Sequence, residues 1–257
     1  MRRVLVVVPF ALDAEGVALR RRQVAAVPLA DDIEFDFRPV KAGPTSFVSP
    51  HDWTLMDIAI FEAGLSAEDD GYDAVCIDTV SDSGADALRS VLDIPVVSPG
   101  RISLLFALTL GSTFGIVAQW EPSLARYRKV IREWGFSEHC AGVEHFDTPP
   151  DFSSLIEGKE EMVFPRMIDA GRRLVGGGAD VVVLGSTTMA AAHAALEEAL
   201  DVPVVNPGPL SYKLAETFLE MGLAQSRGAY PRPHTPKPGL VHAMLDGAAR
   251  HEADAGS

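Results

Sequence analysis

Short runs of apolar residues alternate with longer segments of helical periodicity along the whole chain. Residues 4–8 are a continuous run of Val and Leu, which is typical of a parallel strand buried on both faces. Residues 33–37 alternate apolar with acidic side chains, which predicts a strand nearer an edge of a sheet. Residues 114–118 open a second series in the way that residues 4–8 open the first. This order predicts an α/β fold with two parallel sheets flanked by helices.

Apolar residues at helical spacing predict the intervening helices. In the helix at residues 122–134, the basic residues Arg126, Arg128 and Lys129 are interpreted as a solvated face. The proline-rich residues 227–238 predict irregular structure before a short last helix. The predicted helices are one that follows residues 10–16, one that begins near His51, and those at residues 85–92, 102–110, 122–134, 157–175, 210–221 and 241–249.

One stretch occurs twice. Residues 71–100 match residues 178–208, and each copy is read as strand, polar turn, helix, strand and turn. The first glycines are offset by 178 − 71 = 107 residues and the last by 208 − 100 = 108. The second copy therefore carries one inserted residue, which we place in the loop or helix start after its first strand.

The duplication predicts two pseudo-symmetric lobes. We assign residues 1–100 and 208–257 to the first lobe and residues 101–207 to the second. Ligands of open parallel sheets bind beyond the carboxyl ends of the strands. Thr79 and Ser186 end the first strands of the two copies, so we expect them to face each other across a cleft between the lobes, with the active site there.

The amino-acid composition limits the classes of binding partner that we expect. The 257 residues are 47% hydrophobic and 23% charged, as in a globular chain, and the net charge is −14. This acidity argues against nucleic acid or anionic membrane as a partner, although backbone N–H groups can still bind a small anion. Residues 1–10 are read as a buried strand, and residues 103–111 fall short of the ~20 residues that a membrane span needs. We expect a cytoplasmic protein.

The two cysteines predict neither a disulfide framework nor a metal site. Cys76 and Cys140 are too few for the first and lack the Cys-x-x-Cys spacing of zinc sites. Cys76 lies in mid-strand, where it is interpreted as a small buried hydrophobe. We expect no bound metal.

Polar residues at the strand ends are the candidates for chemistry. Thr79 and Ser186 head loops rich in Ser and Thr, where they either bind a ligand or satisfy local turns. Asp78 either caps the next turn or acts as a general base whose pKa is raised by burial. Asp82 is interpreted as a helix N-cap. His51 precedes a helix and is either a general acid or base or a surface histidine.

The duplicated pattern resembles the aspartate/glutamate racemase superfamily, most closely its hydantoin racemase branch. The likeness rests on DGYDAVCIDTVSDSGADALRSVLDIPVV, on FGIVA, and on GADVVVLGSTTMAAAHAALEEALDVPVV followed by LSYKLAE. It implies two α/β lobes with the active site between them, and no metal, pyridoxal phosphate or nucleotide as cofactor.

The resemblance also implies a chemistry that this chain cannot copy. In the racemases, each copy supplies a cysteine, and the two thiols act as base and acid on opposite faces of a carbon next to a carbonyl. Thr79 and Ser186 occupy those positions here. A thiol can be poised near neutral pH, whereas a hydroxyl is a far weaker acid that needs a neighbouring base. Two-thiol racemisation is therefore not expected.

The anion site of the superfamily can be carried over. There, backbone N–H groups and hydroxyls of the two loops hold the substrate carboxylate or its enolate, an arrangement that stabilises developing negative charge. A further contact comes from the loop after the first strand. The matching residues are Thr79, Val80 and Ser81, then Ser186, Thr187 and Thr188, and after the first strand Pro9 and Phe10, which lead toward Asp13.

The leading hypothesis is a racemase or isomerase that transfers a proton next to a carbonyl of a small amino-acid derivative or carboxylate, without a cofactor. Its expected partner is a small carboxylate or hydantoin-like substrate. Asp78 or His51 replaces the thiols. The second hypothesis is a lyase, decarboxylase or hydrolase, because arylmalonate decarboxylases and maleate isomerases resemble this fold. The third is a binding protein that kept the anion site and lost catalysis. Whether the chain forms a homo-oligomer stays open.

Overall fold

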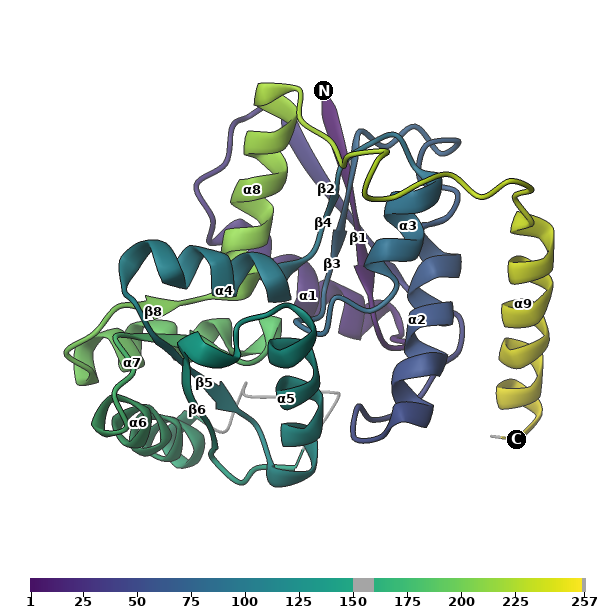
Figure 1. The fold of residues 1–257 in the computed structure, drawn as a ribbon. Coiled ribbons are helices and arrows are strands. Elements are labelled where there is room, and N and C mark those ends of the chain that lie inside the picture. Colours follow the sequence, from purple (N-terminus) through teal and green to yellow (C-terminus); the bar gives the residue numbers. More distant parts are fainter. Residues whose placement is uncertain (150–159, 256–257) are drawn as a thin grey trace. The chain divides into compact units, whose positions relative to one another are not determined.

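A computed structural model describes residues 1–149 and 160–255, and it confirms the predicted α/β fold. The chain divides into two compact units. Unit 1 comprises Met1–Thr45, Pro50–Ser98 and Ser211–Ser257, and unit 2 comprises Ser46–Ser49 and Pro99–Leu210. Each unit is built on a four-stranded parallel sheet with helices packed on it (Figure 1).

The sheet of unit 1 has the strand order β2-β1-β3-β4. The strand β1 lies between β2 and β3, and Val4–Val8 are fully buried, as their uninterrupted apolar run predicts. The alternating residues 33–37 lie in β2 at the sheet edge. The elements of this part of the chain are β1 (Arg2–Val8), α1 (Ala14–Ala25), β2 (Ile33–Pro39), α2 (Pro50–Gly64), β3 (Ala74–Ile77), α3 (Ala85–Val91) and β4 (Val96–Val97).

The sheet of unit 2 repeats this topology in the order β6-β5-β7-β8. Its core packs α6 and α7 against the sheet through fully buried side chains such as Met167 and Leu196. The elements are α4 (Pro99–Leu110), β5 (Phe114–Ala118), α5 (Leu124–Glu133), β6 (Cys140–His145), α6 (Glu160–Gly176), β7 (Val181–Leu184), α7 (His193–Ala199) and β8 (Val204–Val205), with short 3-10 helices η1 (Glu121–Ser123), η2 (Ser137–His139) and η3 (Thr187–Ala192).

The strand registers confirm the duplication to the residue. Val75 pairs with Val96 in unit 1, and Val182 pairs with Val204 in unit 2. The first members of these pairs differ by 182 − 75 = 107 and the second by 204 − 96 = 108. The extra residue of the second copy therefore lies between the two strands, as the sequence predicts.

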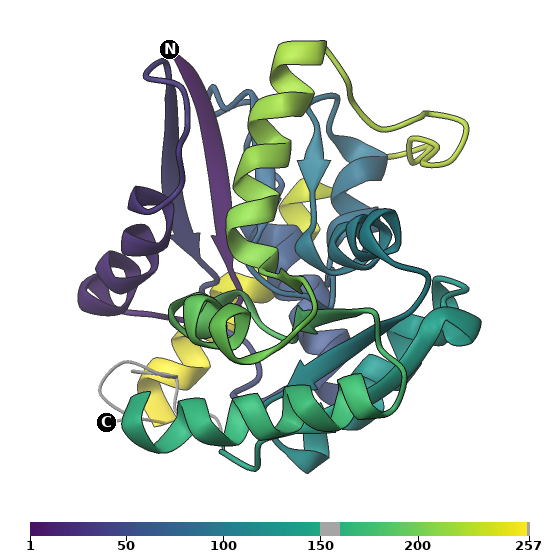
Figure 2. The same cartoon turned by 90° about the vertical axis from the view of Figure 1, so that its left-hand side faces the viewer.

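The closing helix of each copy belongs to the unit of the other copy. The helix α4 follows β4 of unit 1 but packs on the strands of unit 2. The helix α8 (Pro207–Met221) follows β8 and joins unit 1 from Ser211 onward. There its Tyr212 ring lies edge-on to Phe35 at 5.3 Å, and Figure 2 shows α8 along the sheet of unit 1, opposite α2 and α3.

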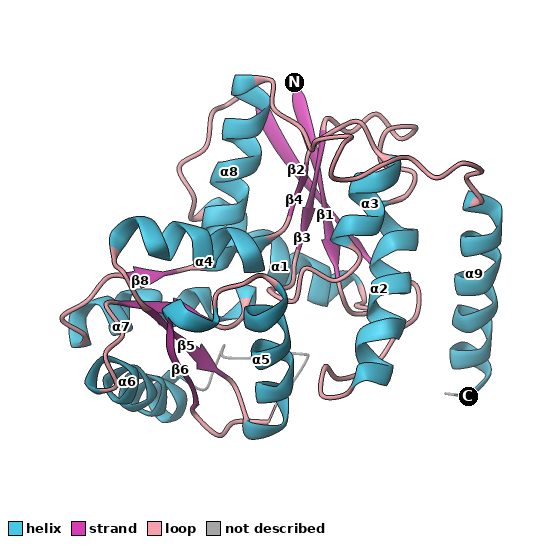
Figure 3. Cartoon of the chain, in the orientation of Figure 1, coloured by secondary structure: helices cyan, strands magenta, loops and turns pink. Residues whose placement is uncertain are grey.

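Two predicted helices need comment. Residues 157–159 of the helix predicted at 157–175 lie outside the described residues, and α6 is seen from Glu160. The last helix is longer than predicted, because α9 spans Pro238–Ala255 with a proline in its first turn (Figure 3). It packs on α2, where Glu62 lies 2.6 Å from His242 and 2.8 Å from Lys41. None of the helices in residues 1–149 and 160–255 is long and apolar enough to cross a membrane.

Candidate active site

Loop 1, residues 78–84, follows strand β3 of unit 1. The Asp78 N–H continues the sheet by donating to Val7 O at 2.9 Å. The Thr79 hydroxyl lies 3.0 Å from the Ser81 hydroxyl, which lies 2.9 Å from the hydroxyl of Ser83. The Ser81 N–H also points at Thr79 Oγ1, at 3.4 Å. Loop 1 thus carries three linked hydroxyl groups immediately beyond a buried strand.

The end of loop 1 differs from the prediction for Asp82. The N-cap of α3 is Gly84, with φ of +69°, and its N–H donates to Asp57 Oδ1 of α2 at 3.0 Å. Asp82 itself adopts a left-handed conformation with φ of +53°. A Cβ at Gly84 would lie 2.9 Å from the Asp57 carbonyl oxygen, so the close approach of α2 requires glycine there. The interpretation of Asp82 as the N-cap is wrong.

Loop 2, residues 185–189, reproduces the first part of loop 1 in unit 2. The Gly185 N–H donates to Val117 O at 2.9 Å. The Ser186 hydroxyl lies 2.8 Å from the Thr188 hydroxyl, and the Thr188 N–H points at Ser186 Oγ at 3.3 Å. Ser186 therefore pairs with the residue two positions ahead, as Thr79 does with Ser81, and it caps η3.

Asp78 is buried beside a cation. Its side chain is 1% exposed, and Oδ2 lies 3.3 Å from Nη1 of Arg20, whose side chain is 7% exposed. Arg20 comes from α1, where it is the first of three consecutive arginines, and the pattern of the sequence does not distinguish it from the other two. Loop 1 therefore begins at a buried ion pair.

Two more titratable groups of unit 1 lie within electrostatic reach of Asp78. Burial, and then the charge of Asp78, raise the pKa of the Tyr212 hydroxyl well above its ordinary value. Burial also raises the pKa of the Cys76 thiol, which points at Ser211 O at 3.8 Å. The pKa of Cys140 is raised by burial as well. Neither thiol is activated, because nucleophilic cysteines have lowered pKa values.

The remaining predicted site residues are placed as follows. The His51 side chain is 77% exposed in the first turn of α2, with Nδ1 3.2 Å from Asp52 Oδ1. No hydrogen bond joins it to loop 1 among the described residues. After β1, Pro9 is buried and Phe10 is half-buried. In the loops, Val80 and Thr187 are buried.

Unit 2 has no carboxylate at the position that corresponds to Asp78. Gly185 stands there, and a Cβ on it would lie 2.5 Å from Val117 O and 2.7 Å from the hydroxyl of Tyr127. That hydroxyl donates to Gly185 O at 2.5 Å. The preceding residue, Arg126, is 8% exposed and stacks on aromatic rings, so its interpretation as part of a solvated face is wrong.

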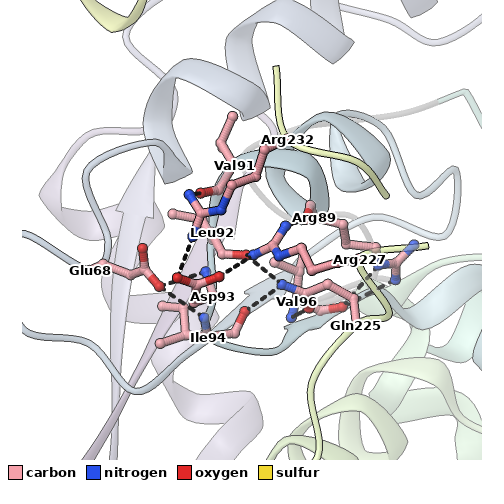
Figure 4. Close-up of polar contacts among 10 residues, drawn as sticks. All are labelled: Glu68, Arg89, Val91, Leu92, Asp93, Ile94, Val96, Gln225, Arg227 and Arg232. Carbon is pink, nitrogen blue, oxygen red and sulfur yellow. Dashed lines mark hydrogen bonds and ion pairs between the residues drawn. The ribbon is translucent and has the colours of Figure 1, made fainter. Parts of the chain in front are cut away.

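The C-terminal segment fastens the far end of α3 (Figure 4). Gln225 Nε2 donates to Leu92 O at 2.8 Å, and Arg227 reaches the Asp93 carboxylate at 2.5 Å. Arg232 forms a second ion pair with Asp93. Hydrogen bonds from Arg227 and then Arg232 lower the pKa of Asp93.

No group of three or more His, Cys, Asp and Glu side chains that could hold a metal ion occurs in the part of the chain that the structure describes. Besides the carboxylates of Asp78 and Asp82, the polar groups of the loops are hydroxyls and backbone amides. Such donors suit an anionic oxygen.

Comparison with known proteins agrees with this arrangement. The profile of the family described as Asp/Glu/Hydantoin racemase matches residues 19–215. Hydantoin racemase from Pseudomonas sp. (strain NS671) is 28% identical over 188 residues, 73% of this chain and 74% of that protein. Hydantoin racemase from Paenarthrobacter aurescens is 25% identical over 244 residues, 90% of this chain and 97% of that protein.

Among solved structures, allantoin racemase from Klebsiella pneumoniae has a TM-score of 0.81 at 24% identity, covering 92% of this chain and 95% of that chain. This likeness shows a common fold. The profile match extends over most of the chain and includes both loops. The resemblance read from the duplicated motif is confirmed, and the chain belongs to the Asp/Glu/hydantoin racemase family.

Proposed function

We propose that this protein catalyses cofactor-independent proton transfer at a carbon next to a carbonyl of a small carboxylate or hydantoin-like compound. Its family supports a function of the racemase or isomerase type. The observation that carries the proposal is the repeated hydroxyl pair, Thr79 with Ser81 and Ser186 with Thr188. Thr79 and Ser186 occupy the positions at which the resemblance to the racemases places the two cysteines. The route does not use thiols at those positions.

In unit 1, the Thr79 and Ser81 hydroxyls and the Val80 N–H are proposed donors to a carboxylate or to the enolate that forms when the proton leaves. In unit 2, the Ser186 and Thr188 hydroxyls and the Thr187 N–H are proposed donors to the same kinds of group. Donors arranged in advance stabilise such charge at little reorganisation cost. Pro9 and Phe10 line the approach after β1.

The proton-transfer group is proposed to be Asp78, with His51 as the alternative. A hydroxyl becomes reactive only beside a base, and Asp78 directly precedes Thr79 in a desolvated position. His51 carries an imidazole, a side chain that often serves as acid or base in catalysis, but it is mostly exposed. Asp78→Asn and His51→Gln distinguish them, because only the variant of the true proton-transfer group loses turnover while it still binds substrate.

Isotope exchange tests the proposal. Single enantiomers of aspartate, glutamate, allantoin and a 5-substituted hydantoin are incubated with the protein in deuterium oxide. Allantoin is included because a structural neighbour bears the name allantoin racemase. We expect one of these compounds to gain one deuterium at the α carbon and to lose optical rotation. Absence of exchange on every compound overturns the proposal.

The missing family thiols favour one alternative, a lyase, decarboxylase or hydrolase on the same scaffold. The same incubation distinguishes this alternative from racemisation. Decarboxylation removes CO2 and hydrolysis adds water, so each changes the molecular mass of the compound, whereas racemisation only exchanges hydrogen for deuterium. A protein that has lost catalysis gives ligand-induced thermal stabilisation with no exchange and no mass change.

A further inference from the structure

A buried cation in unit 2 lacks a counter-ion among residues 1–149 and 160–255. Arg126 is 8% exposed, and its guanidinium lies over two aromatic rings, 4.7 Å from the Tyr127 centroid and 5.1 Å from that of Phe47. Its Nε is buried without a hydrogen-bond partner. Within the described ranges, the contacts of its guanidinium are these two ring contacts.

This environment is costly for a free arginine. Arginine stays charged in proteins, and a buried charge is stable only when it is paired and hydrogen-bonded. A cation–π contact returns less than the cost of removing the guanidinium from water. Arg20, the buried arginine of unit 1, has a counter-ion, because its Nη1 lies 3.3 Å from the carboxylate of Asp78. The environment of Arg126 calls for an anion from outside the described chain.

Two other side-chain nitrogens of unit 2 also support an external ligand. The atoms Gln119 Nε2 and His145 Nδ1 are buried with no hydrogen-bond partner among the residues that the structure describes. Gln119 directly follows β5 and His145 ends β6. Ala118 is the Cα partner of His145, and Val117 that of Leu184, so these residues share the carboxyl edge of the sheet with loop 2.

Arg126 is tied to the same edge. It adjoins Tyr127 in α5, and the Tyr127 hydroxyl binds the carbonyl oxygen of Gly185, the residue before Ser186. A guanidinium presents N–H donors in a planar fork that matches a carboxylate. The edge of the unit 2 sheet therefore gathers an arginine, an amide, an imidazole and the hydroxyls of loop 2.

We propose that Arg126 binds a carboxylate of the substrate at this edge, so that the natural substrate is an acid rather than a neutral hydantoin. This inference rests on the proposed function and narrows its substrate class. The rings of Phe47 and Tyr127 hold the guanidinium flat, and Gln119 and His145 supply the neighbouring hydrogen bonds. A carboxylate in this position supplies the counter-ion that Arg126 lacks among the described residues.

Calorimetric titration with two probes, succinate and neutral hydantoin, at constant ionic strength tests the inference on wild type, Arg126→Gln and Arg126→Lys. Arg128→Gln is the matched control, because it removes the same charge from an exposed position of the same helix. We expect Arg126→Gln to weaken succinate binding roughly tenfold to a hundredfold, the loss of charge-assisted hydrogen bonds. Arg126→Lys retains part of the affinity, and Arg128→Gln retains all of it.

Hydantoin affinity is expected to be the same in all four proteins. Circular dichroism identifies a variant that fails to fold, and Arg126→Lys then supplies the comparison. Unchanged succinate affinity in Arg126→Gln, equal losses for succinate and hydantoin, or no succinate binding by wild type overturns the inference. These readings require no turnover, so failed isotope exchange with intact Arg126-dependent binding rejects the proposed function alone.

Discussion

Loops 1 and 2 have the same pattern of hydrogen bonds at their start but differ in the charged side chains near them. Each begins with an N–H that donates to the central strand, at 2.9 Å in both, and continues with a hydroxyl pair two residues apart. In each unit, the helix after the first strand sends a polar side chain to the residue that opens the loop. That side chain is Arg20 toward Asp78 in unit 1 and Tyr127 toward Gly185 in unit 2.

The difference separates what duplication preserved from what diverged. The sheet register and the hydroxyl pairs are common to both copies, as a shared scaffold for holding an anion requires. The buried charges are not: unit 1 contains both members of an ion pair, whereas in unit 2 the described residues supply only the cation. We therefore assign ligand binding to the buried charge of unit 2, whereas the ion pair of unit 1 stabilises that unit and holds Asp78, the proposed proton-transfer group, next to Thr79.

The largest expected effect comes from breaking the ion pair. Arg20→Met leaves the Asp78 carboxylate buried without its cation, which should lower the free energy of unfolding by roughly 3 kcal/mol. Urea denaturation measures it. Arg21→Met, an exposed neighbour, should change stability by less than about 0.5 kcal/mol. Equal stabilities of the two variants would contradict a stabilising role of the pair.

The next effect tests why unit 2 has glycine where unit 1 has aspartate. Gly185→Ala places a methyl group 2.5 Å from a backbone oxygen, and we expect it to cost about 2 kcal/mol. The matched control is Gly176→Ala, where the added Cβ meets nothing within 4 Å. Both are compared by urea denaturation. A Gly185→Ala variant as stable as the control would show that loop 2 can move aside.

The hydroxyls that the loops share should matter to turnover more than to stability. Thr79→Val and Ser186→Ala should each slow α-proton exchange by about 100-fold, the loss of one donor to the developing charge, and cost about 1 kcal/mol of stability. Thr109→Val, on the exposed side of α4, is the control. Full exchange in both loop variants would remove the loops from the chemistry, and a loss in only one would show that they are not equivalent.

The smallest effect concerns a carboxylate that both copies share before the strand. Asp180 accepts from Ser112 N at 2.8 Å and Thr113 N at 3.0 Å, and these bonds lower its pKa. Its counterpart Asp73 accepts from Arg3 N at 2.7 Å. A carboxylate whose pKa is lower in the folded than in the unfolded state stabilises the fold at pH values above its unfolded-state pKa. This stabilisation is lost as the pH falls through the folded-state pKa.

Asp180→Asn should therefore be less stable than wild type at neutral pH, with a difference that shrinks once the pH falls below the ordinary range of aspartate. Thermal unfolding from pH 7 to pH 3 measures this difference. A difference that stays constant with pH would assign the effect to the lost geometry rather than to the charge.

The sequence predicted the parts that follow from periodicity and repetition. The apolar run at residues 4–8 predicted a central strand, and the offsets of 107 and 108 predicted matching registers. The polar residues after the repeated strands predicted two hydroxyl loops, because hydroxyls in such positions pair locally. The assignment of those residues to catalysis stays a prediction.

The charged partners could not be predicted. Arg20 and Arg126 both lie in helices rich in basic residues, where a solvated face is the ordinary interpretation. Only the packing of α1 and α5 on their sheets buries one arginine of each group, and that depends on helix rotation, which local sequence does not specify. The misassigned N-cap has the same origin, since Gly84 is fixed by the approach of α2.

The central claim is proton transfer without thiols, and a cysteine-free protein tests it most directly. Deuterium exchange is measured on the compound that wild type accepts, using the Cys76→Ala, Cys140→Ala double variant and the Thr79→Val, Ser186→Ala double variant. The account predicts that the first retains most of the wild-type exchange rate and that the second loses it. Exchange that disappears with the cysteines and persists without the loop hydroxyls would contradict the account.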